Sequence, residues 1–422
     1  MKLRNFMYAT MIACAFASCS NDDEIPNPGT DPVAGGDAVL AIRVAGLNQT
    51  KSASFADGKT DASIQSLHVY VFNAAGALET VGEATSTTLA TNEILQTSVT
   101  AGAKKVIVIA NHSKENPATV DALCSTSLTY GANEYNGNLS MNSQVYDLTI
   151  QAGKTNCLGY ADADITGDRV QAVTTTGGTT VTTSPVPLYR NVAKVKVASI
   201  AMKTGSEMKY PNATFELDSV FILHARNTST LATVTPWGAT ATDGSLNGIP
   251  NERYTDWVAK MLGKDKIKNY MTGGYSLYTA GVLGDAKNGT AASNSSLAKV
   301  DSFYVYENAV KAMPVAADTT LLVVSGKFLP EGESTANKDA IETSYYTVAV
   351  GIDGNPSVTP LNSTSGRTEF KGVLRNMEYQ ISLTIAGPGY ETPFGPKQED
   401  QTFLDVQCVV VEFGIVNQPV EI

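Results

Sequence analysis

The sequence predicts an all-β protein built from two β-sandwich-like domains in tandem, with short helices confined to loops. Short apolar runs rich in β-branched and aromatic residues recur along the 422 residues, as in the strands of a sandwich. Gly, Pro and Asn residues separate these runs, where tight turns are needed. No run shows the apolar period of a long amphipathic helix. At roughly 100–200 residues per domain, the chain has the length of two domains once an export segment is removed.

The first 19 residues read MKLRNFMYATMIACAFASC and have the pattern of an export signal. Lys2 and Arg4 provide a basic start, and the apolar run at 6–17 is too short for a permanent transmembrane helix, which needs about 20 residues. The small residues before Cys19 resemble the lipobox of bacterial lipoprotein precursors, whose signal is cut before a lipid-bearing cysteine. We therefore expect removal of residues 1–18 and lipidation of Cys19. The alternative is an ordinary signal peptide with a chance cysteine.

The residues after this cysteine change from acidic, to linker-like, to strand-like. Residues 20–24 (SNDDE) resemble the surface-export signal of Bacteroidota lipoproteins, with a solvated linker as the alternative, and 26–36 is a Pro- and Gly-rich linker. Residues 38–45 (AVLAIRVA) then alternate apolar side chains on one face, which predicts a first strand in contact with a core. The polar stretch at 47–59, which contains Lys51, is expected to be exposed and open to proteases.

Residues 52–188 are expected to form the first domain. A strand is predicted at 64–73 (IQSLHVYVFN), where His68 alternates with apolar neighbours and is interpreted as a strand-surface residue. A turn follows at 73–76. The apolar run of a second strand at 104–111 (KKVIVIAN) is continuous, so both of its faces are expected to be covered. A short helix is expected within 115–127.

Residues 189–422 are expected to form the second domain, because the Thr-, Gly- and Pro-rich stretch before residue 188 has the composition of a boundary. The strand predicted at 189–200 alternates Ala193, Val195 and Val197 against Val192, Lys194 and Lys196. A short helix is expected near 256–262. The remaining predicted strands are 213–225, 302–306, 320–328, 345–352, 377–385 and the apolar tail at 403–422.

The composition argues against several classes of function. The formal net charge is −11 and no Lys/Arg cluster occurs, so we expect no nucleic-acid partner. The five cysteines include no CxxC pair and the three histidines have no metal-ligand spacing, so we expect no metal and no cofactor. No catalytic motif is present, and we expect no catalytic residue and no enzyme. Spacing alone leaves open a carboxylate pair for sugar hydrolysis.

Two terminal strands suggest assembly. The first strand precedes the segment that contains Lys51, and the tail places Val409, Val411, Phe413 and Ile415 on one face of a strand. Removal of a paired first strand would leave an apolar groove with unpaired backbone groups, which templates pairing with another chain. A neighbour's terminal strand could fill this groove by β-augmentation, and such a contact propagates as an open filament. The alternative is that both strands stay in their own domains.

Several segments of the chain resemble the fimbrillin family, the subunits of Bacteroidales type V pili. They include the lysine before SASFA (52–56) and the strands LHVYVFN (67–73) and KKVIVIAN (104–111). The second half adds YRNVAKVKV (189–197), FELDSVFILHARNTSTL (215–231), RNMEYQISLTI (375–385) and VVVEFGIVNQPVEI (409–422). Their order and spacing carry the resemblance more than any single segment. For the fold, the resemblance implies two transthyretin-like β-sandwich domains.

For function, the resemblance implies a structural subunit of a cell-surface fimbria that supports adhesion. The precursor would carry a lipid such as palmitate on Cys19 as a transient anchor in the outer membrane. A trypsin-like outer-membrane protease would cut between Lys51 and Ser52, release residues 19–51 and allow strand exchange with other copies and other fimbrial subunits. The best-known pattern of the family has arginine before the cut. Arg43 lies inside the predicted strand, and Lys59 is a further candidate.

Stalk, tip and anchor subunits of such fimbriae share this fold. The complete apolar tail favours a stalk subunit, whose donor strand would contain Val409, Val411, Phe413 and Ile415, because a tip subunit need not donate a strand. An anchor would keep its lipid. The competing hypotheses are the anchor or tip adhesin of the same fimbria and a lipid-anchored surface protein that binds glycans.

Overall fold

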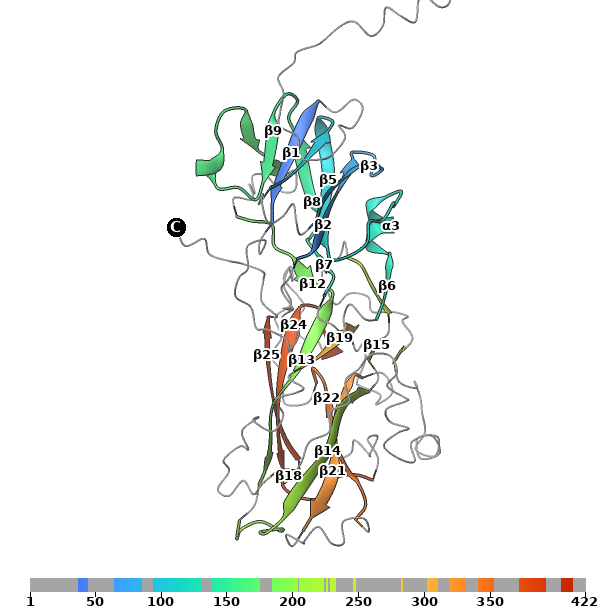
Figure 1. The fold of residues 1–422 in the computed structure, drawn as a ribbon, viewed down its shortest axis with the longest axis vertical. Coiled ribbons are helices and arrows are strands. Elements are labelled where there is room, and N and C mark those ends of the chain that lie inside the picture. The colour runs from blue at the N-terminus through green and yellow to red at the C-terminus, as the bar shows by residue number, and fades with distance from the viewer. Residues whose placement is uncertain are drawn as a thin grey trace, which may run out of the picture. The chain divides into compact units, whose positions relative to one another are not determined.

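The computed structural model describes the part of the chain that forms the sheets. The described ranges are 37–44, 64–85, 94–130, 138–174, 184–203, 205–223, 225–226, 228–232, 246–247, 282–283, 302–309, 319–330, 341–352, 372–391 and 404–412. All of them lie in one compact unit, residues 33–422. Within these ranges the only helices are α3 (Val120–Cys124) and a 3-10 turn at Asp162–Asp164, neither long enough to cross a membrane. The all-β prediction is confirmed (Figure 1).

Two sheets enclose a first hydrophobic core in the N-terminal half (Figure 1). The four-stranded sheet has the order β10 (Arg169–Gln171), β9 (Thr155–Leu158), β1 (Ala38–Arg43), β4 (Ile94–Val99). The facing sheet has the order β11 (Val173–Thr174), β8 (Tyr146–Ile150), β5 (Gly102–Ala110), β2 (Ser66–Asn73), β3 (Leu78–Thr85). In addition, β7 (Met141–Asn142) pairs with β5, and β12 (Tyr189–Arg190) pairs with β7.

Both faces of β5 are covered, as its continuous apolar run predicts. Val106 and Val108 lie in the first core, whereas Ile107 and Ile109 pack on the opposite face with residues of α3. This α-helix falls inside the range expected from the sequence. The interpretation of His68 as a surface residue is wrong, because its side chain is 8% exposed. Covering layers on both sides of the sheet bury positions that alternation alone would place in solvent.

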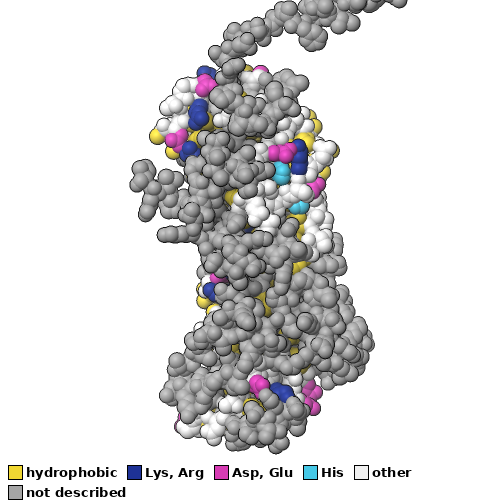
Figure 2. Space-filling model, viewed as in Figure 1, with side chains coloured by type: hydrophobic (Ala, Val, Ile, Leu, Met, Phe, Trp, Pro, Cys, Tyr) yellow, Lys and Arg dark blue, Asp and Glu magenta, His cyan; other side chains and the backbone are white. Residues whose placement is uncertain are grey.

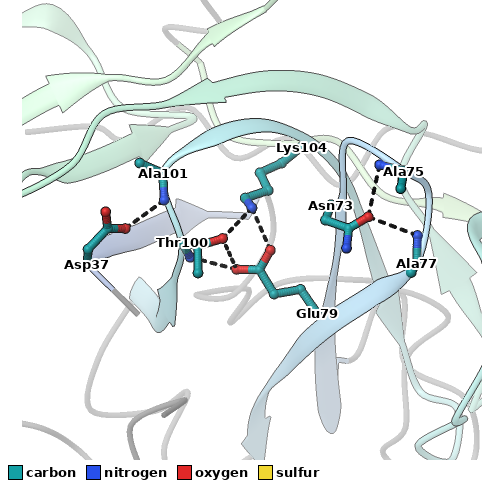
Figure 3. Close-up of polar contacts among 8 residues, drawn as sticks. All are labelled: Asp37, Asn73, Ala75, Ala77, Glu79, Thr100, Ala101 and Lys104. Carbon is teal, nitrogen blue, oxygen red and sulfur yellow. Dashed lines mark hydrogen bonds and ion pairs between the residues drawn. The ribbon is translucent and has the colours of Figure 1, made fainter. Parts of the chain in front are cut away.

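The turn expected at 73–76 joins β2 to β3. Asn73 Oδ1 accepts hydrogen bonds from the backbone N–H groups of Ala75, at 2.9 Å, and Ala77, at 3.1 Å (Figure 3). Gly76 has φ +80°, a left-handed conformation that glycine adopts without steric cost. The side chain of Asn73 therefore replaces water as the acceptor for the turn, which is the reason asparagine favours this position.

Two further sheets enclose a second hydrophobic core in the C-terminal half. The first has the order β19 (Ser302–Tyr306), β13 (Val192–Met202), β24 (Met377–Ile385), β25 (Leu404–Glu412). The second has the order β18 (Val282–Leu283), β14 (Thr214–Leu223), β21 (Leu321–Leu329), β22 (Ser344–Ala349). Three two-stranded sheets pair β15 (Ala225–Arg226) with β17 (Leu246–Asn247), β16 (Thr228–Thr230) with β6 (Ser127–Thr129), and β20 (Asn308–Ala309) with β23 (Gly372–Val373).

Alternation along β13 and β24 decides which side chains enter the second core. Ala193, Val195 and Val197 are buried in it, as the sequence predicts, whereas Val192 packs in the cluster on the other face. Every second residue of β24, from Met377 to Ile385, is buried in the same core. These two strands pair in parallel.

The division into domains at residues 188 and 189 stays our proposal. The buried residues of the first core all precede residue 189 and those of the second all follow residue 192. Strands cross this division, however, since β12 pairs with β7 and β16 pairs with β6. Backbone pairing and side-chain packing therefore continue across any domain boundary placed here.

Candidate functional site

The first strand, β1, lies inside its sheet and is hydrogen-bonded on both edges (Figure 1). It pairs antiparallel with β4 from Ala38 to Arg43, and parallel with β9 from Val39 to Ile42. In the sheet order β4 is a terminal strand, and β1 is its neighbour. Loss of β1 would therefore leave β4 and β9 with unpaired backbone groups facing each other across an empty position.

The inner face of β1 belongs to the first core. Ala38, Leu40, Ile42 and Val44 all point into it and are at most 7% exposed. Burial of a leucine or isoleucine side chain stabilises a fold by about 1.5–3 kcal/mol. Without β1, the first-core residues that pack against these four side chains would be exposed. The site therefore favours occupation by another strand with apolar side chains at alternate positions.

The outer face of β1 is covered at one position. Ala41 is completely buried against Cys157 and Tyr160, and Ile165 packs beside them. We call Cys157, Tyr160 and Ile165 the outer cover. Val39 and Arg43, the outward residues on either side of Ala41, are partly exposed. The outer face therefore accepts side chains of ordinary size at two positions, and only a small one at the position between them.

Arg43 fixes the outer cover in place. Its guanidinium carbon lies 4.5 Å from the ring centroid of Tyr160, and its Nη1 donates to Asp164 Oδ2 at 2.7 Å. Arg169 lies over the same ring at 5.7 Å. Burial raises the pKa of the Tyr160 phenol and of the Cys157 thiol above their ordinary values. Both groups are therefore neutral at physiological pH.

Hydrogen bonds hold both ends of β1. At its start, Asp37 Oδ1 accepts from the backbone N–H of Ala101 at 2.6 Å (Figure 3), and the backbone oxygen of Asp37 accepts from Gly153 at 2.7 Å. At its end, the Arg43 oxygen accepts from the Val186 N–H at 2.8 Å. A Cβ on Gly159, which has φ +86°, would lie 2.5 Å from this oxygen, so glycine is required there.

A buried polar cluster anchors the turn between β4 and β5 (Figure 3). Glu79 Oε1 accepts from the N–H of Thr100 at 2.6 Å and from its hydroxyl at 3.0 Å. Lys104 Nζ donates to Glu79 Oε2 at 2.5 Å and to Thr100 Oγ1 at 2.7 Å. These contacts do not involve β1, so they tie the end of β4 to β3 and β5 whether or not β1 is present.

Replacement of Glu79 by alanine is expected to lower the free energy of unfolding by about 3–5 kcal/mol, because it leaves a buried ammonium without its carboxylate. The Lys104 and Glu79 side chains are 3% and 10% exposed. Urea unfolding followed by circular dichroism measures the change. Glu83→Ala is the matched control on the same strand, since Glu83 pairs with Lys114 in solvent at 44% and 49% exposure and contributes about 0–1 kcal/mol. Equal effects of the two variants would contradict the anchoring role.

Of the residues predicted for lipidation, for cleavage at Lys51-Ser52 and for the donor strand, the structure describes Val409 and Val411. Val409 and Val411 lie in β25, an edge strand that pairs with β24 of the same chain (Figure 1), opposite Gln380 and Glu378. Val409 is 58% exposed, the one large hydrophobic side chain so exposed among the residues whose burial is described. Outside the described residues lie Cys19, Lys51, Ser52, Phe413 and Ile415. Their predicted roles remain proposals.

The outer cover and the Glu79 anchor could not be predicted from the sequence. Cys157 and Tyr160 carry no motif, and the register of β1 with β9 that brings Cys157 opposite Ala41 joins segments more than a hundred residues apart. Cys124, Cys157 and Cys408 are buried and take no part in a disulfide. Within the described ranges, no three His, Cys, Asp or Glu side chains are grouped to hold a metal. Acidic and basic side chains lie next to each other on the face shown in Figure 2.

Comparisons with known proteins give the relationship of this chain. The profile of the family "Major fimbrial subunit protein (FimA)" matches residues 38–190, which begin at β1 and end with β12. The profile "FimA4 pilin C-terminal domain" matches residues 262–413, so the two together span more than half of the chain. This chain belongs to the fimbrillin family. The resemblance found in the sequence is confirmed.

The similarity of this fimbrillin to known relatives covers nearly its whole length. Major fimbrium subunit FimA type-4 of Porphyromonas gingivalis is 26% identical, with 99% of each chain covered. A solved structure of a putative cell adhesion protein from Parabacteroides distasonis is 25% identical with a TM-score of 0.55, covering 90% of this chain and 99% of that one. A fimbrilin from Porphyromonas gingivalis W83 shares the fold at 22% identity, with a TM-score of 0.56 over 92% and 100% of the two chains. These relatives support a structural subunit of a cell-surface fimbria.

Proposed function

We propose that this fimbrillin is a stalk subunit that is exported as a lipoprotein through Cys19 and matured by a trypsin-like protease at Lys51-Ser52. Removal of residues 19–51 takes β1 out of its sheet. The C-terminal tail of another subunit then fills the empty position, and repetition of this contact builds the fimbria. The lipid serves as a transient outer-membrane anchor that leaves with the released segment. The fimbria supports adhesion.

The observation that carries the proposal is the placement of β1. It is hydrogen-bonded on two edges and contributes four apolar side chains to the first core, yet it precedes Lys51 by only a few residues in the sequence. A cut at Lys51 therefore separates a core strand covalently from the rest of its domain. The vacated position has the two properties that β-augmentation requires, namely unpaired backbone groups and an apolar floor.

The position of Arg43 supports cleavage at lysine over cleavage at the nearest arginine. Arg43 lies within β1, its backbone oxygen is bonded to Val186, and the following residue Val44 is 4% exposed. A protease needs its substrate in an extended and accessible conformation, which a paired internal strand does not offer. Lys51 lies beyond the end of β1, with Lys59 as the second candidate.

The position of β25 supports the tail as donor. Among the described residues this strand is the last one, it lies at the edge of its sheet, and apolar residues continue in the sequence after Glu412. A terminal apolar segment that follows an edge strand can reach another subunit without disturbing the second core. Donor and acceptor surfaces differ, so the contact is heterologous and extends into an open filament.

Limited trypsin treatment of the purified precursor tests the proposal. We expect one main product that begins at Ser52 and then assembles into ladders that resist mild heating in detergent. Cys157, which β1 covers, reports the intermediate state: a maleimide should label it in the cleaved monomer, but not in the precursor or in the ladder. Peptide mapping separates this label from those on the other two buried thiols, Cys124 and Cys408.

Lys51→Gln is the matched variant for this experiment, and Lys51→Gln/Lys59→Gln removes the second candidate as well. If the cut falls at Lys51, the single variant should stay monomeric after trypsin, with Cys157 protected. If the cut falls at Lys59, only the double variant should do so. A cleaved wild-type product that remains monomeric at high concentration would contradict strand exchange by this subunit. Ladders formed by the uncleaved precursor would contradict the requirement for β1 removal.

A further inference from the structure

We propose that Gly414 sets the register of the incoming strand by taking the place of Ala41 under the outer cover. This inference rests on the proposed strand exchange and adds the specificity-determining residue. In this register Phe413 and Ile415 take the places of Leu40 and Ile42 in the first core.

The acceptor imposes a size limit at one position. Ala41 has no exposed surface, since Cys157 and Tyr160 cover it and are themselves completely buried. The guanidinium carbon of Arg169 lies 5.7 Å from the ring centroid of Tyr160, and Arg169 belongs to β10, which remains when β1 and its Arg43 leave. Overpacking a filled site typically costs about 1–3 kcal/mol. A strand that places a bulky residue at this position is therefore disfavoured relative to one that places a small residue there.

The acceptor also requires apolar residues on both sides of the small one. Leu40 and Ile42 flank Ala41 and point into the first core at 0% and 1% exposure. The groove therefore selects the pattern apolar–small–apolar at three consecutive residues. Val39 and Arg43, the next outward positions, are partly exposed and set no such limit.

The sequence of the tail contains this pattern once. Pro419 lacks a backbone N–H, which excludes it from a strand paired on both edges and restricts the donor to the residues before it. From Leu404 to Gln418 the small residues are Cys408 and Gly414. Cys408 follows a glutamine and is buried in the second core of its own chain, whereas Gly414 stands between Phe413 and Ile415.

The same register follows for either direction of the inserted strand, because the apolar residues flank Gly414 symmetrically. Glycine within a strand weakens it and commonly marks a position where another group approaches closely. The tail thus carries a residue that is unfavourable in an isolated strand at the one place where the acceptor admits only a small residue. Recognition by the acceptor therefore accounts for a glycine that strand propensity does not explain.

Disulfide trapping with the native Cys157 tests the register. Ala41 is the partner of Cys157 in the β1–β9 pairing, and neighbouring strands lie about 4.7–4.9 Å apart, within the Cα separation that a disulfide accepts. We expect trypsin-treated Gly414→Cys to give a covalent ladder under mild oxidation. Glu412→Cys and Val416→Cys are the matched controls on the same face, about 6.6–6.8 Å further along the strand, and should give little covalent product. Cys157→Ser in the Gly414→Cys chain should abolish it.

The outcomes separate the register from strand exchange itself. If wild-type chains form ladders but Glu412→Cys or Val416→Cys links to Cys157 in place of Gly414→Cys, the register is wrong and strand exchange stands. If trypsin-treated wild-type chains form no ladder, the proposed function fails first. Gly414→Leu provides a second measurement without a new thiol: loss of the ladder with unchanged urea unfolding of the monomer supports the register, and an unchanged ladder contradicts it.

Discussion

Replacement of Arg375 by methionine is expected to lower the free energy of unfolding by about 3–5 kcal/mol, the usual cost of leaving a buried charge without its partner. The Arg375 side chain has no exposed surface, and its Nη2 pairs with the carboxylate of Glu307, which is 11% exposed. Nη1 donates to Asn191 Oδ1 at 3.0 Å, and Nη2 donates to the hydroxyls of Ser229 at 3.2 Å and Thr230 at 3.3 Å. Methionine satisfies none of these acceptors.

Urea unfolding followed by fluorescence measures this loss, with Lys105→Met as the matched control. Lys105 pairs with Asp147 at 44% and 33% exposure, so its replacement should cost about 0–1 kcal/mol. The double variant Arg375→Met/Glu307→Gln should recover part of the stability, because it removes the unpaired carboxylate as well. An Arg375→Met chain as stable as Lys105→Met would show that Arg375 is not part of the stabilising network.

The network around Arg375 lies where strands from the two halves of the chain come together. The next residue, Asn376, accepts from the Arg190 N–H through its Oδ1 at 3.1 Å and donates its own N–H to the Val192 oxygen at 2.8 Å. Asn376 has φ +58°, a left-handed conformation that asparagine tolerates better than most residues. These polar and backbone connections join the two halves of the chain through directional contacts, which non-directional hydrophobic packing alone does not provide.

The fold class could be predicted because long strands carry their own signal. The predicted strand at 377–385 coincides with β24, and the alternation at 192–197 identifies the core face of β13. These strands have strictly alternating or continuously apolar sequences over many residues. The strands β3 (LETVGEAT) and β9 (TNCL) escaped prediction because they are polar or short, and their neighbours in the sheet create their strand conformation.

The candidate site was predictable only in part, for a different reason. The alternation of Leu40, Ile42 and Val44 predicts a core-facing strand, which the structure confirms. The outer cover on its other face depends on the parallel pairing of β1 with β9, whose residues are more than a hundred positions away in the sequence. The partnership of Glu79 and Lys104 likewise follows from strand order and register, which local patterns do not specify.

Deletion of residues 413–422 is expected to abolish ladder formation while leaving the monomer folded. The strand β25 ends at Glu412 and pairs with β24 along its whole length, from Met377 opposite Glu412 to Ile385 opposite Leu404. The deletion removes none of these pairs and none of the side chains that β25 contributes to the second core, namely Leu404, Val406 and Cys408. Its effect should therefore fall on assembly and not on stability.

Two measurements on trypsin-treated chains separate these effects: the ladder in detergent gels and the urea midpoint of the monomer. Deletion from residue 404 is the matched comparison, since it also strips the pairing partner from β24 and should unfold the second core. Mixing supplies a further control: a chain without 413–422 keeps its groove, so it should cap growing ladders and shorten them in proportion to its share of the mixture. A truncated chain that unfolds would place the tail in its own core. If it polymerises normally, the incoming strand must come from elsewhere in the molecule, because the groove left by β1 would be filled without the tail.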